Sequence, residues 1–456
     1  MSPLMTRADS RTVRGWCLYD WANSAYVTTA AAALLPAYFV EGVAAGDVAF
    51  FGRPVPASGV WALGVGVSAL VVFLLAPVLG AVADYRRAKL RFLRAFAFGG
   101  ALFASLLFFA TPGAVWLTIG LFVLAQICFT SGNVFYDAFL PSIVPDEEAD
   151  RVSARGFSYG YVGGGLQFAV ALGLVAGHEA LGLDRVTAVR IALLMAGLWW
   201  FGFSALAFRW MRAAEADPRP GSEAMGYGAL ARLGVRRTLE TARRLPRFKS
   251  LALFLVAFLL YNDGIQTVIG QASAYASDEL GLDTVWIMVT FLVVQFVAVL
   301  GATAFGRLAE RVGTKRAVIA TLVGWTLVVV FAYFIPRGSV AGFLTMGVAV
   351  GVVMGGAQAL SRSLYAVMIP REAAAEFFGF FSVFGKLSAV VGPFLFFGLS
   401  AAFGSARPAI LAMIAFFVVG IVLLSRVDLE QAKRERDAWA FRGDDVDAAV
   451  PAGAPS

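Results

Sequence analysis

The chain has 456 residues, of which 59% are hydrophobic and only 15% are charged, and its mean hydropathy is +0.77. Soluble domains have about a quarter charged residues, so this composition excludes a single soluble core and indicates a polytopic membrane protein. The net charge of +7 fits cationic loops on one side of a membrane; no basic segment lies in a recognisable nucleic-acid-binding fold, so no nucleic-acid partner is expected.

Apolar runs long enough to cross a membrane follow one another along the chain. A spanning helix needs roughly 20 apolar residues. Twelve runs meet this length: 16–40, 58–83, 92–111, 115–140, 153–177, 187–209, 250–272, 284–305, 317–335, 339–363, 376–400 and 406–425. A signal peptide is the alternative for the first run, but that run is too long and contains Asp20 and Asn23. The sequence therefore predicts an all-α membrane protein with twelve transmembrane helices.

The connections between these runs alternate in charge. The cation-rich set holds Arg7, Arg11 and Arg14; Arg86, Arg87, Lys89 and Arg91; segment 210–249; Arg307, Arg311, Lys315 and Arg316; and Lys433, Arg434 and Arg436. The other set holds little beyond Arg53, Arg185, Arg337 and Arg407. Cytoplasmic loops carry the excess of cations, which predicts that both termini are cytoplasmic.

The long cationic connection divides the runs into two halves. We expect an N-terminal six-helix bundle at 1–209, a cytoplasmic linker at 210–249, a C-terminal six-helix bundle at 250–425 and a partly disordered cytoplasmic tail at 426–456. In the linker, leucines alternate with arginines, which suits a cationic helix on the inner membrane face. A solvated helix fits nearly as well.

A short motif repeats at corresponding places in the two halves. It reads GAVADYRRAK at 80–89 and GRLAERVGTK at 306–315. In both copies an acid follows the first glycine by four residues, as Asp84 and Glu310, and a lysine follows it by nine. Glycine lets helices approach closely, and the acid can accept from a helix N-terminus or an arginine. One copy alone reads as an ordinary positive-inside loop, but two matched copies weaken that interpretation.

Here the chain resembles the major facilitator superfamily, over essentially all twelve spans. The residues that match its loop signature are Gly306, Arg307, Leu308, Ala309, Glu310, Arg311, Gly313 and Lys315, with Glu for the usual Asp. The first copy, with Gly80, Asp84 and Lys89, departs at Arg87, where a second glycine is expected; this puts the local turn in question. The resemblance implies two pseudo-symmetric bundles that rock about a central site, and a monomer.

A narrower resemblance rests on five stretches. They are YDWANSAY (19–26), FYDAFLPSIV (135–144), YNDGIQTV (261–268), GGAQALSRSLYAVMIP (355–370) and EFFGFFSVFGKLSAVVGP (376–393). Together they are similar to the bacterial branch of the family of the autophagy-related vacuolar amino-acid effluxer. That resemblance implies export of small amino acids or similar metabolites, and a place in the bacterial inner membrane.

Polar side chains inside the apolar runs are the candidate functional residues, because a charge at the bilayer centre costs about 2.5–3.5 kcal/mol. They form five clusters: Asp20 and Asn23; Asn133, Tyr136 and Asp137; Asn262, Asp263 and Gln266; Gln358 and Arg362; and Lys386. The first four clusters lie in the first, fourth, seventh and tenth runs. The superfamily resemblance implies that these four spans line the central cavity.

Pairings between these clusters can be proposed from their depth. Asp263 and Lys386 are expected at one depth, as a charge pair or as ligands of a zwitterion. Asp20 is expected to meet Arg362 as an inner gate, and Asp263 is a candidate to take up a coupling proton. The alternatives are structural: an interhelix bond or a cap for Asp20 and Asp137, and an ion pair for Lys386.

Two glycine stripes repeat every four residues. They are Gly156, Gly160 and Gly164, and Gly347, Gly351 and Gly355. Small residues at this spacing predict tight helix packing, with sliding surfaces as the sharper alternative. The fifth run lacks the glycine–proline pattern of known antiporters, so antiport is not inferred.

Catalytic and cofactor motifs are weak. The string from Gly379 to Leu387 is no phosphate loop, because five residues separate its glycines and Leu387 stands where Ser or Thr is required. His178 is the single histidine, and Cys17 and Cys128 lie in apolar runs, so neither a histidine-based site nor a disulfide framework is expected. No cofactor or metal is predicted.

The sequence therefore predicts a secondary active transporter and not an enzyme. It would move a small polar solute, an amino acid or similar metabolite, by alternating access and in the direction of efflux, with proton coupling left open. A sugar, nucleoside or drug transporter is the alternative, as is a receptor or scaffold that carries nothing. An aspartyl dyad of Asp20 and Asp137 is disfavoured because neither lies in a catalytic motif.

Overall fold

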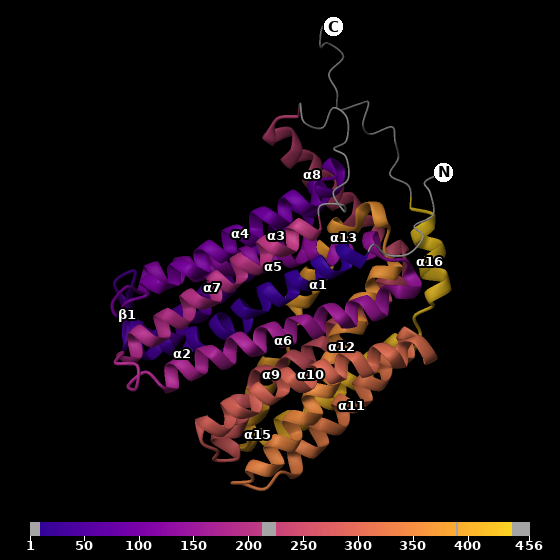
Figure 1. Ribbon diagram of the computed structural model, residues 1–456. Coiled ribbons are helices and arrows are strands. Elements are labelled where there is room, and N and C mark those ends of the chain that lie inside the picture. The colour runs from indigo at the N-terminus through magenta and orange to yellow at the C-terminus, as the bar shows by residue number, and fades with distance from the viewer. Residues whose placement is uncertain (1–9, 212–224, 389–390, 440–456) are drawn as a thin grey trace.

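The structure, a computed structural model, describes residues 10–211, 225–388 and 391–439. Within these ranges, twelve helical segments are long and apolar enough to cross a membrane. Figure 1 shows them as two groups, α1 to α7 in indigo to magenta and α9 to α15 in rose through orange to gold. The protein is therefore an all-α membrane protein built from two six-helix bundles.

The first bundle contains six spans and a short hairpin. Its elements are α1 (Ser10–Ala25), the π-helical η1 (Tyr26–Leu34), α2 (Leu35–Tyr38), the π-helical η2 (Phe39–Ala44), β1 (Asp47–Phe50), β2 (Arg53–Pro56), α3 (Ala57–Arg86), α4 (Lys89–Leu106), η3 (Leu107–Phe109), α5 (Val115–Ile143), η4 (Asp146–Glu148), α6 (Ala149–Ala176) and α7 (Arg185–Trp210). The elements from α1 to η2 form one continuous span. Strands β1 and β2 pair antiparallel, with Val48 opposite Val55.

The second bundle follows the connecting helix α8 (Tyr227–Arg244). Its elements are η6 (Leu245–Arg247), α9 (Lys249–Ala274), the π-helical η7 (Tyr275–Glu279), α10 (Thr284–Val312), α11 (Thr314–Phe334), α12 (Val340–Met368), η8 (Arg371–Ala373), α13 (Ala374–Leu387), α14 (Val391–Phe403) and α15 (Ala406–Ser425), and α16 (Leu429–Asp437) comes after them. The eleventh span is divided into two helices, because α13 ends at Leu387 and Ser388 is in a turn, and α14 is described from Val391 onward. Pro393 suits the first turn of α14, where its missing N–H has no partner to lose.

Each of the twelve predicted runs corresponds to an observed span, with ends that differ by several residues. The hairpin, the broken eleventh span and α16 were not predicted. The tail was expected to be partly disordered; its first part is helical, and 440–456 lie outside the described residues, as do Arg7 and 212–224. The linker helix α8 packs on α3, where Gly234 lies against Val82.

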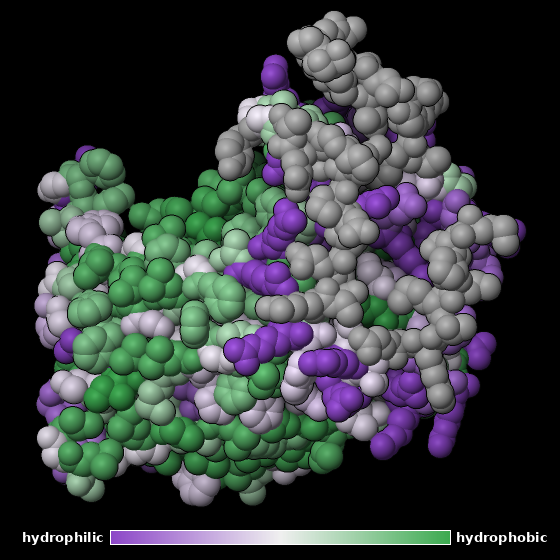
Figure 2. All heavy atoms as spheres, turned by 45° about the horizontal axis from the view of Figure 1, so that its top comes forward, coloured by the Kyte–Doolittle hydropathy of each residue, from purple (hydrophilic) through white to green (hydrophobic). Residues whose placement is uncertain are grey.

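The flanks of the bundles expose large apolar side chains, as lipid-facing helices do. Leu300, Leu327, Phe334 and Phe397 are each more than half exposed. In Figure 2 the flank is largely hydrophobic, and hydrophilic residues gather toward one end. That end holds the α3–α4 and α10–α11 connections with α8 and α16, and we call it the cationic end (Figure 1). The hairpin lies at the opposite end.

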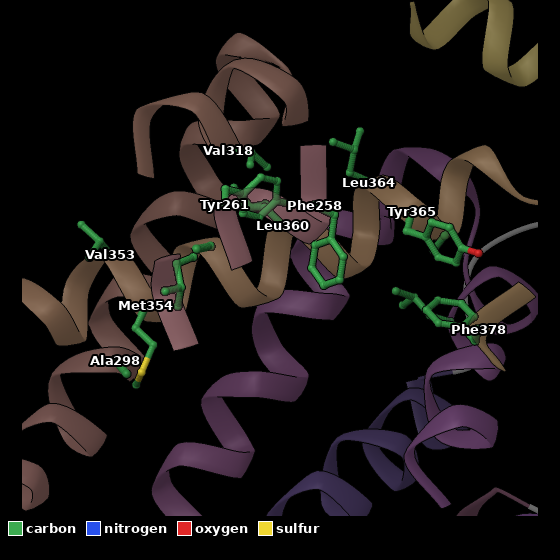
Figure 3. Close-up of a cluster of buried hydrophobic side chains, with 14 of the residues drawn as sticks. Phe258, Tyr261, Ala298, Val318, Val353, Met354, Leu360, Leu364, Tyr365 and Phe378 are labelled. Atoms are coloured by element: carbon green, nitrogen blue, oxygen red, sulfur yellow. The ribbon is translucent and has the colours of Figure 1, made fainter. Parts of the chain in front are cut away.

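Buried apolar side chains join the two bundles near the cationic end. One cluster includes Trp16 and Phe139 of the first bundle together with Leu364 and Phe378 of the second. Figure 3 shows part of it, with Phe258 of α9 beside side chains of α12 and α13. A second cluster contains residues of the first bundle alone. The shared cluster therefore fixes how the bundles meet.

The two glycine stripes lie at tight helix contacts, as predicted. On α6, a Cβ added at Gly160 would lie 2.8 Å from Ser24 Oγ of α1. On α12, a Cβ at Gly355 would collide with the Ala298 carbonyl of α10. Both helices thus approach their neighbours more closely than a side chain allows.

The turn in the first copy of the loop motif forms without its second glycine. Arg87 takes up a left-handed conformation, with φ 56° and ψ 39°. Gly313 occupies the corresponding position in the second copy, with φ 88°. Both copies therefore place a positive φ at this position, but ψ is 39° at Arg87 and 145° at Gly313, so the two turns differ.

Candidate functional site

A cavity of about 750 Å³ lies between the two bundles. At the end nearest the cationic end of the molecule, which we call its inner end, the cavity is lined by Asp20, Asn23, Asn133 and Gln358. From there it extends along α1, α6, α9, α10 and α12 to Phe343, in the first turn of α12 near the opposite end. Five of the predicted residues line it, because Gln266 also does.

Both walls of this cavity mix polar and apolar side chains. The first bundle presents Ser24 and the apolar Phe129, Phe157 and Phe168, and Asn23 Nδ2 donates to Asn133 Oδ1 at 2.7 Å. The second bundle presents bulky apolar side chains beside three amides: Met288, Phe291, Met346, Val350 and Met354, with Gln266, Gln295 and Gln358. Among the described lining residues, Asp20 is the one Asp, Glu, Lys, Arg or His.

Arg362 closes the inner end of the cavity. Its Nη1 lies 3.1 Å from Asp137 Oδ1 and 3.9 Å from Asp20 Oδ2. Its Nε donates to Ser153 Oγ at 3.0 Å, and its Nη2 donates to the Ser153 carbonyl at 2.9 Å. One arginine of the second bundle thus contacts α1, α5 and α6 of the first. Asp20 and Arg362 meet as predicted, although Asp137 is the nearer acid.

Aromatic rings enclose this guanidinium. Arg362 Cζ lies 4.1 Å from the ring centroid of Phe157 and 4.7 Å from that of Trp16. Trp16 stacks on Tyr136, with centroids 4.5 Å apart, and Tyr136 Oη donates to Asp20 Oδ2 at 3.2 Å. The rings stabilise the cation through their faces and exclude water, which strengthens the neighbouring charge–charge contacts.

Further polar contacts between the bundles surround this arginine. Ser153 Oγ donates to the Ala359 carbonyl at 2.7 Å, Tyr161 Oη to Gln358 Oε1 at 2.6 Å, Ser363 Oγ to Asp150 Oδ1 at 2.5 Å, the Glu376 N–H to Asp84 Oδ2 at 2.8 Å, and Arg371 and Arg436 to Asp146 at 3.0 and 2.6 Å. These contacts lie toward the cationic end. Because they join the two bundles, they close the cavity at that end.

At the opposite end, the strongest contacts hold each bundle to itself. Arg407 Nε lies 2.9 Å from Glu279 Oε1, and both belong to the second bundle. Arg190 Nε donates to the Phe108 carbonyl at 2.6 Å within the first bundle. Between the two ends, Gln295 Nε2 of the second bundle donates to Thr28 Oγ1 of the first at 3.0 Å. In the described ranges, the ion pairs between the bundles therefore gather at the cationic end, and a single amide contact joins the bundles farther along the cavity.

The predicted pairing of Asp263 with Lys386 is wrong. Both carboxylate oxygens of Asp263 accept from the Gly392 N–H, at 3.0 Å each, so Asp263 caps the N-terminus of α14. Asn262 Nδ2 donates to Ser388 Oγ beside the same break. Neither Asn262 nor Asp263 is among the described lining residues of the cavity. The polar pair in α9 therefore binds the broken eleventh span.

Lys386 lies at the end of α13, next to this break. It is partly buried, and no acidic side chain in the described ranges forms an ion pair with it. The expected pairing did not allow for the end of α13, which falls one residue after Lys386. Lys386 does not line the described cavity.

In the first copy of the loop signature, α3 lies against α13. A Cβ at Gly80 would collide with the Ala375 carbonyl, so α3 and α13 touch backbone to backbone. Asp84 caps α13 through the Glu376 N–H, and its Oδ1 lies 3.1 Å from Lys89 Nζ. The acid of this copy thus bonds the first bundle to the second.

The second copy is built differently around its acid. Gly306 packs against Ala154 of α6, and Lys315 Nζ donates to the Val427 carbonyl at 2.9 Å. Glu310 and Arg311 are exposed. Glu310 therefore does not repeat the capping contact of Asp84. The two copies match in sequence spacing but not in the contacts that their acids make.

Several residues of the closed end were missed from the sequence. They are Trp16, Asp146, Asp150, Ser153, Phe157, Tyr161 and Arg436. One signal was available. The acidic run DEEAD at 146–150 lies in a connection on the same membrane side as the cation-rich connections. Such a run next to cationic connections indicates contacts between loops or helix ends.

The fold, the central cavity and the closed end define a membrane transporter of the major facilitator class, and solved structures agree. The E. coli fucose:proton symporter FucP superposes with a TM-score of 0.64 at 13% identity, over 92% of this chain and 98% of that chain. A bacterial homologue of the iron transporter ferroportin, in an outward-facing state, superposes with a TM-score of 0.62 at 14% identity, over 92% and 99%. These likenesses show the fold.

The chain belongs to the family described as Vacuole effluxer Atg22 like, whose model matches residues 8–437. The uncharacterized MFS-type transporter YxiO of Bacillus subtilis (strain 168) is 32% identical over 434 residues, which is 93% of this chain and 97% of that protein. Autophagy-related protein 22-1 of Neosartorya fischeri is 29% identical over 311 residues, 64% of this chain and 50% of the fungal protein. The protein is therefore an MFS-type transporter and not an enzyme.

Proposed function

We propose that the protein exports a small polar solute, an amino acid or a similar metabolite, by alternating access. The observation that carries this proposal is the cavity of about 750 Å³ between two bundles whose mutual ion pairs and most of whose mutual hydrogen bonds, among the described residues, lie toward the cationic end. Its volume lies in the range of small-molecule sites. Rocking of the bundles would break the contacts of Arg362 and open the closed end, which moves a bound solute across the membrane.

The cationic end is assigned to the cytoplasm. It carries Lys89, Arg91, Lys315 and Arg316 at the helix connections, and cytoplasmic loops are enriched in such residues. Both termini then lie in the cytoplasm, and the membrane is the bacterial inner membrane. In this orientation the cavity faces outward. A monomer suffices, because one chain lines the cavity.

The solute class and direction rest on the family. Its description names a vacuole effluxer, which supports export, and the cavity offers amides and hydroxyls to a polar solute. The Arg362 cluster acts as the inner gate in this proposal, since it bonds α12 to three helices of the other bundle. A coupling proton would be bound by a carboxylate that faces the cavity.

Flux measurements with pure protein in proteoliposomes test this function. Amino acids, short peptides and sugars are offered as a panel, with and without a pH gradient. We expect flux of amino acids or similar metabolites. In Arg362→Gln the inner gate is weakened, so we expect that this variant no longer accumulates the solute against a gradient. Arg337→Gln, a change at an exposed arginine near the opposite end, is the matched control and retains this accumulation.

Two other outcomes are informative. If a sugar is carried and amino acids are not, the solute class is wrong and alternating access stands. If a folded, monodisperse protein carries no member of the panel under any gradient, the transport proposal is contradicted in favour of a receptor or scaffold.

A further inference from the structure

We propose that the carboxylate of Asp20 binds, in turn, a proton and the ammonium group of the solute, so that the cavity recognises a positive charge and needs no carboxylate on the solute. This inference rests on the proposed transport function and adds the charge and the orientation of the cargo. It assigns to Asp20 the proton-binding and solute-binding role that the sequence analysis proposed for Asp263.

A charge count at the inner end of the cavity carries the first step. Two carboxylates, Asp20 and Asp137, share one guanidinium, Arg362, which is buried to 3% exposure. The cluster holds one negative charge more than positive charge when both acids are ionised. An uncompensated charge in a water-poor interior is unfavourable, so a further cation is required there. A proton or an ammonium group can supply it.

Access decides which of the two acids takes the second cation. Asp20 lines the cavity, and Asp137 and Arg362 are not among the described lining residues. Arg362 is also nearer to Asp137, at 3.1 Å, than to Asp20, at 3.9 Å. Asp137 is therefore neutralised by the arginine, and Asp20 is the acid left to a group that arrives through the cavity.

The groups around Asp20 come from four helices. Ionisable or charged neighbours are Cys17 and Tyr19 on α1, Tyr136 and Asp137 on α5, Tyr161 on α6 and Arg362 on α12. Tyr136 donates to Asp20 Oδ2, and Tyr161 donates to Gln358. A second cation, Arg155 of α6, acts on Cys17 and is exposed. Arg362 is the cation of this set that forms an ion pair with Asp20 and Asp137, which keeps Asp20 as the excess charge.

The walls set the orientation of the solute. Next to Asp20, Asn23 and Asn133 present amide groups, and their mutual hydrogen bond fixes both. Across the cavity stand Met288, Phe291, Met346, Val350 and Met354. A primary ammonium group with an apolar body would place the charge beside Asp20 and the body among the apolar side chains, to which the first bundle adds Phe129, Phe157 and Phe168. No Lys, Arg or His among the described lining residues is available to bind a carboxylate.

The exchange balances in charge and protons. The protonated Asp20 releases its proton to water as the ammonium ion R–NH3⁺ enters, and the carboxylate then pairs with that ion. When the solute leaves, a proton returns to the carboxylate. With an amine as the solute, each step keeps the net charge of the Asp20–Asp137–Arg362 cluster and its ligand at zero, so neither step buries an unpaired charge. An amino acid adds one carboxylate, which has to stay in the water of the cavity.

Equilibrium binding to the purified full-length protein in nanodiscs tests the inference without flux. The probes are two matched series: phenethylamine, phenylalanine and 3-phenylpropionate, and isoamylamine, leucine and 4-methylpentanoate. Within a series the body is the same and the charged groups differ. We expect the amine and the amino acid to bind with similar affinity, and the acid to bind at least ~100-fold more weakly, because a buried charge pair is lost.

Variants of Asp20 separate recognition from folding. Asp20→Asn should weaken amine binding by ~30-fold or more, while Asp20→Glu, which keeps the charge, should retain most of it. Asp278→Asn is the matched control, because Asp278 is exposed and is not among the described lining residues. In weakly buffered solution at mildly acidic pH, binding of the amine should release protons from the native protein and the control but not from Asp20→Asn.

Each remaining outcome counts against the inference. Binding of the acids as tight as that of the amines, binding by Asp20→Asn equal to native, proton release that persists in Asp20→Asn, or failure of both series to bind would overturn it. Flux of some other solute in proteoliposomes would leave the proposed transport function standing in each of these cases, so the two failures can be told apart.

Discussion

Arg87 holds a backbone conformation that residues with a Cβ avoid. Its φ of 56° and ψ of 39° are left-handed, and its side chain is exposed at the end of α3. Left-handed geometry disfavours such a residue by roughly 1–2 kcal/mol, and glycine removes that penalty. The larger freedom of glycine in the unfolded chain offsets part of the gain.

Arg87→Gly is therefore expected to stabilise the protein by about 0.5–1 kcal/mol without changing transport. The measurement is thermal unfolding in detergent, compared with Arg91→Gly, which lies in the helical part of α4 and should destabilise. A lower unfolding temperature for Arg87→Gly than for the native chain would show that the left-handed turn carries no strain.

Asp263 is placed as a helix cap by its two contacts with the Gly392 N–H. A cap needs an acceptor oxygen more than a charge, since asparagine and aspartate cap helices about equally well. A coupling residue needs the charge itself. Substitution by Asn and by Ala therefore distinguishes the two roles.

We expect Asp263→Asn to retain most of the transport rate, and Asp263→Ala to lower the stability by about 1–2 kcal/mol. Flux in proteoliposomes and thermal unfolding are measured on both variants. Loss of pH-driven flux in a stable Asp263→Asn protein would show that transport needs the charge of Asp263, as a coupling residue does.

At the scale of whole helices, glycine stripes set how closely neighbours approach. Gly355 of α12 lies against the Ala298 carbonyl of α10, and Gly347 of the same stripe lies against Thr290. Backbone atoms cannot move aside as a flexible side chain can, so an added side chain must separate the helices.

Gly355→Val is thus expected to destabilise the protein by about 1–3 kcal/mol or to prevent its insertion in folded form. Gly270→Val is the control, because a Cβ there meets nothing within 4 Å. Yield of monodisperse protein and the unfolding temperature are the readouts, and equal values for the two variants would contradict the packing described here.

The spans could be predicted because hydrophobic length is a local property of the chain. Side-chain partners could not, since depth along a helix leaves rotation about its axis open. Asp263 and Lys386 illustrate this: the eleventh span breaks at Leu387, and Asp263 turns to the start of α14. Pro393 was a readable signal of that start.

The Asp20–Arg362 contact was predictable for the opposite reason. Both residues lie near the cationic ends of spans that the superfamily resemblance places around one cavity. The rest of the closed end, above all Ser153 and Asp150 on α6, depends on which helix of one bundle meets which helix of the other. That choice is made by the packing of both bundles together, and no single segment encodes it.

On the scale of the whole molecule, polar contacts and apolar packing join the two bundles at the same end. The shared apolar cluster and the contacts of Arg362 both join the bundles toward the cationic end. At the other end Arg407 and Glu279 hold the second bundle to itself. Alternating access therefore requires that the cationic end open during each transport cycle.

A reversible cross-link across the closed end tests that requirement most directly. Ser158 Oγ of α6 and Thr303 Oγ1 of α10 lie 3.5 Å apart, so cysteines at these two positions are well placed to form a disulfide. The pair is introduced into a chain in which Cys17 and Cys128 are replaced by alanine, with each single cysteine as control. We predict that oxidation stops solute flux in proteoliposomes and that reduction restores it. Undiminished flux through a fully cross-linked protein would contradict the account.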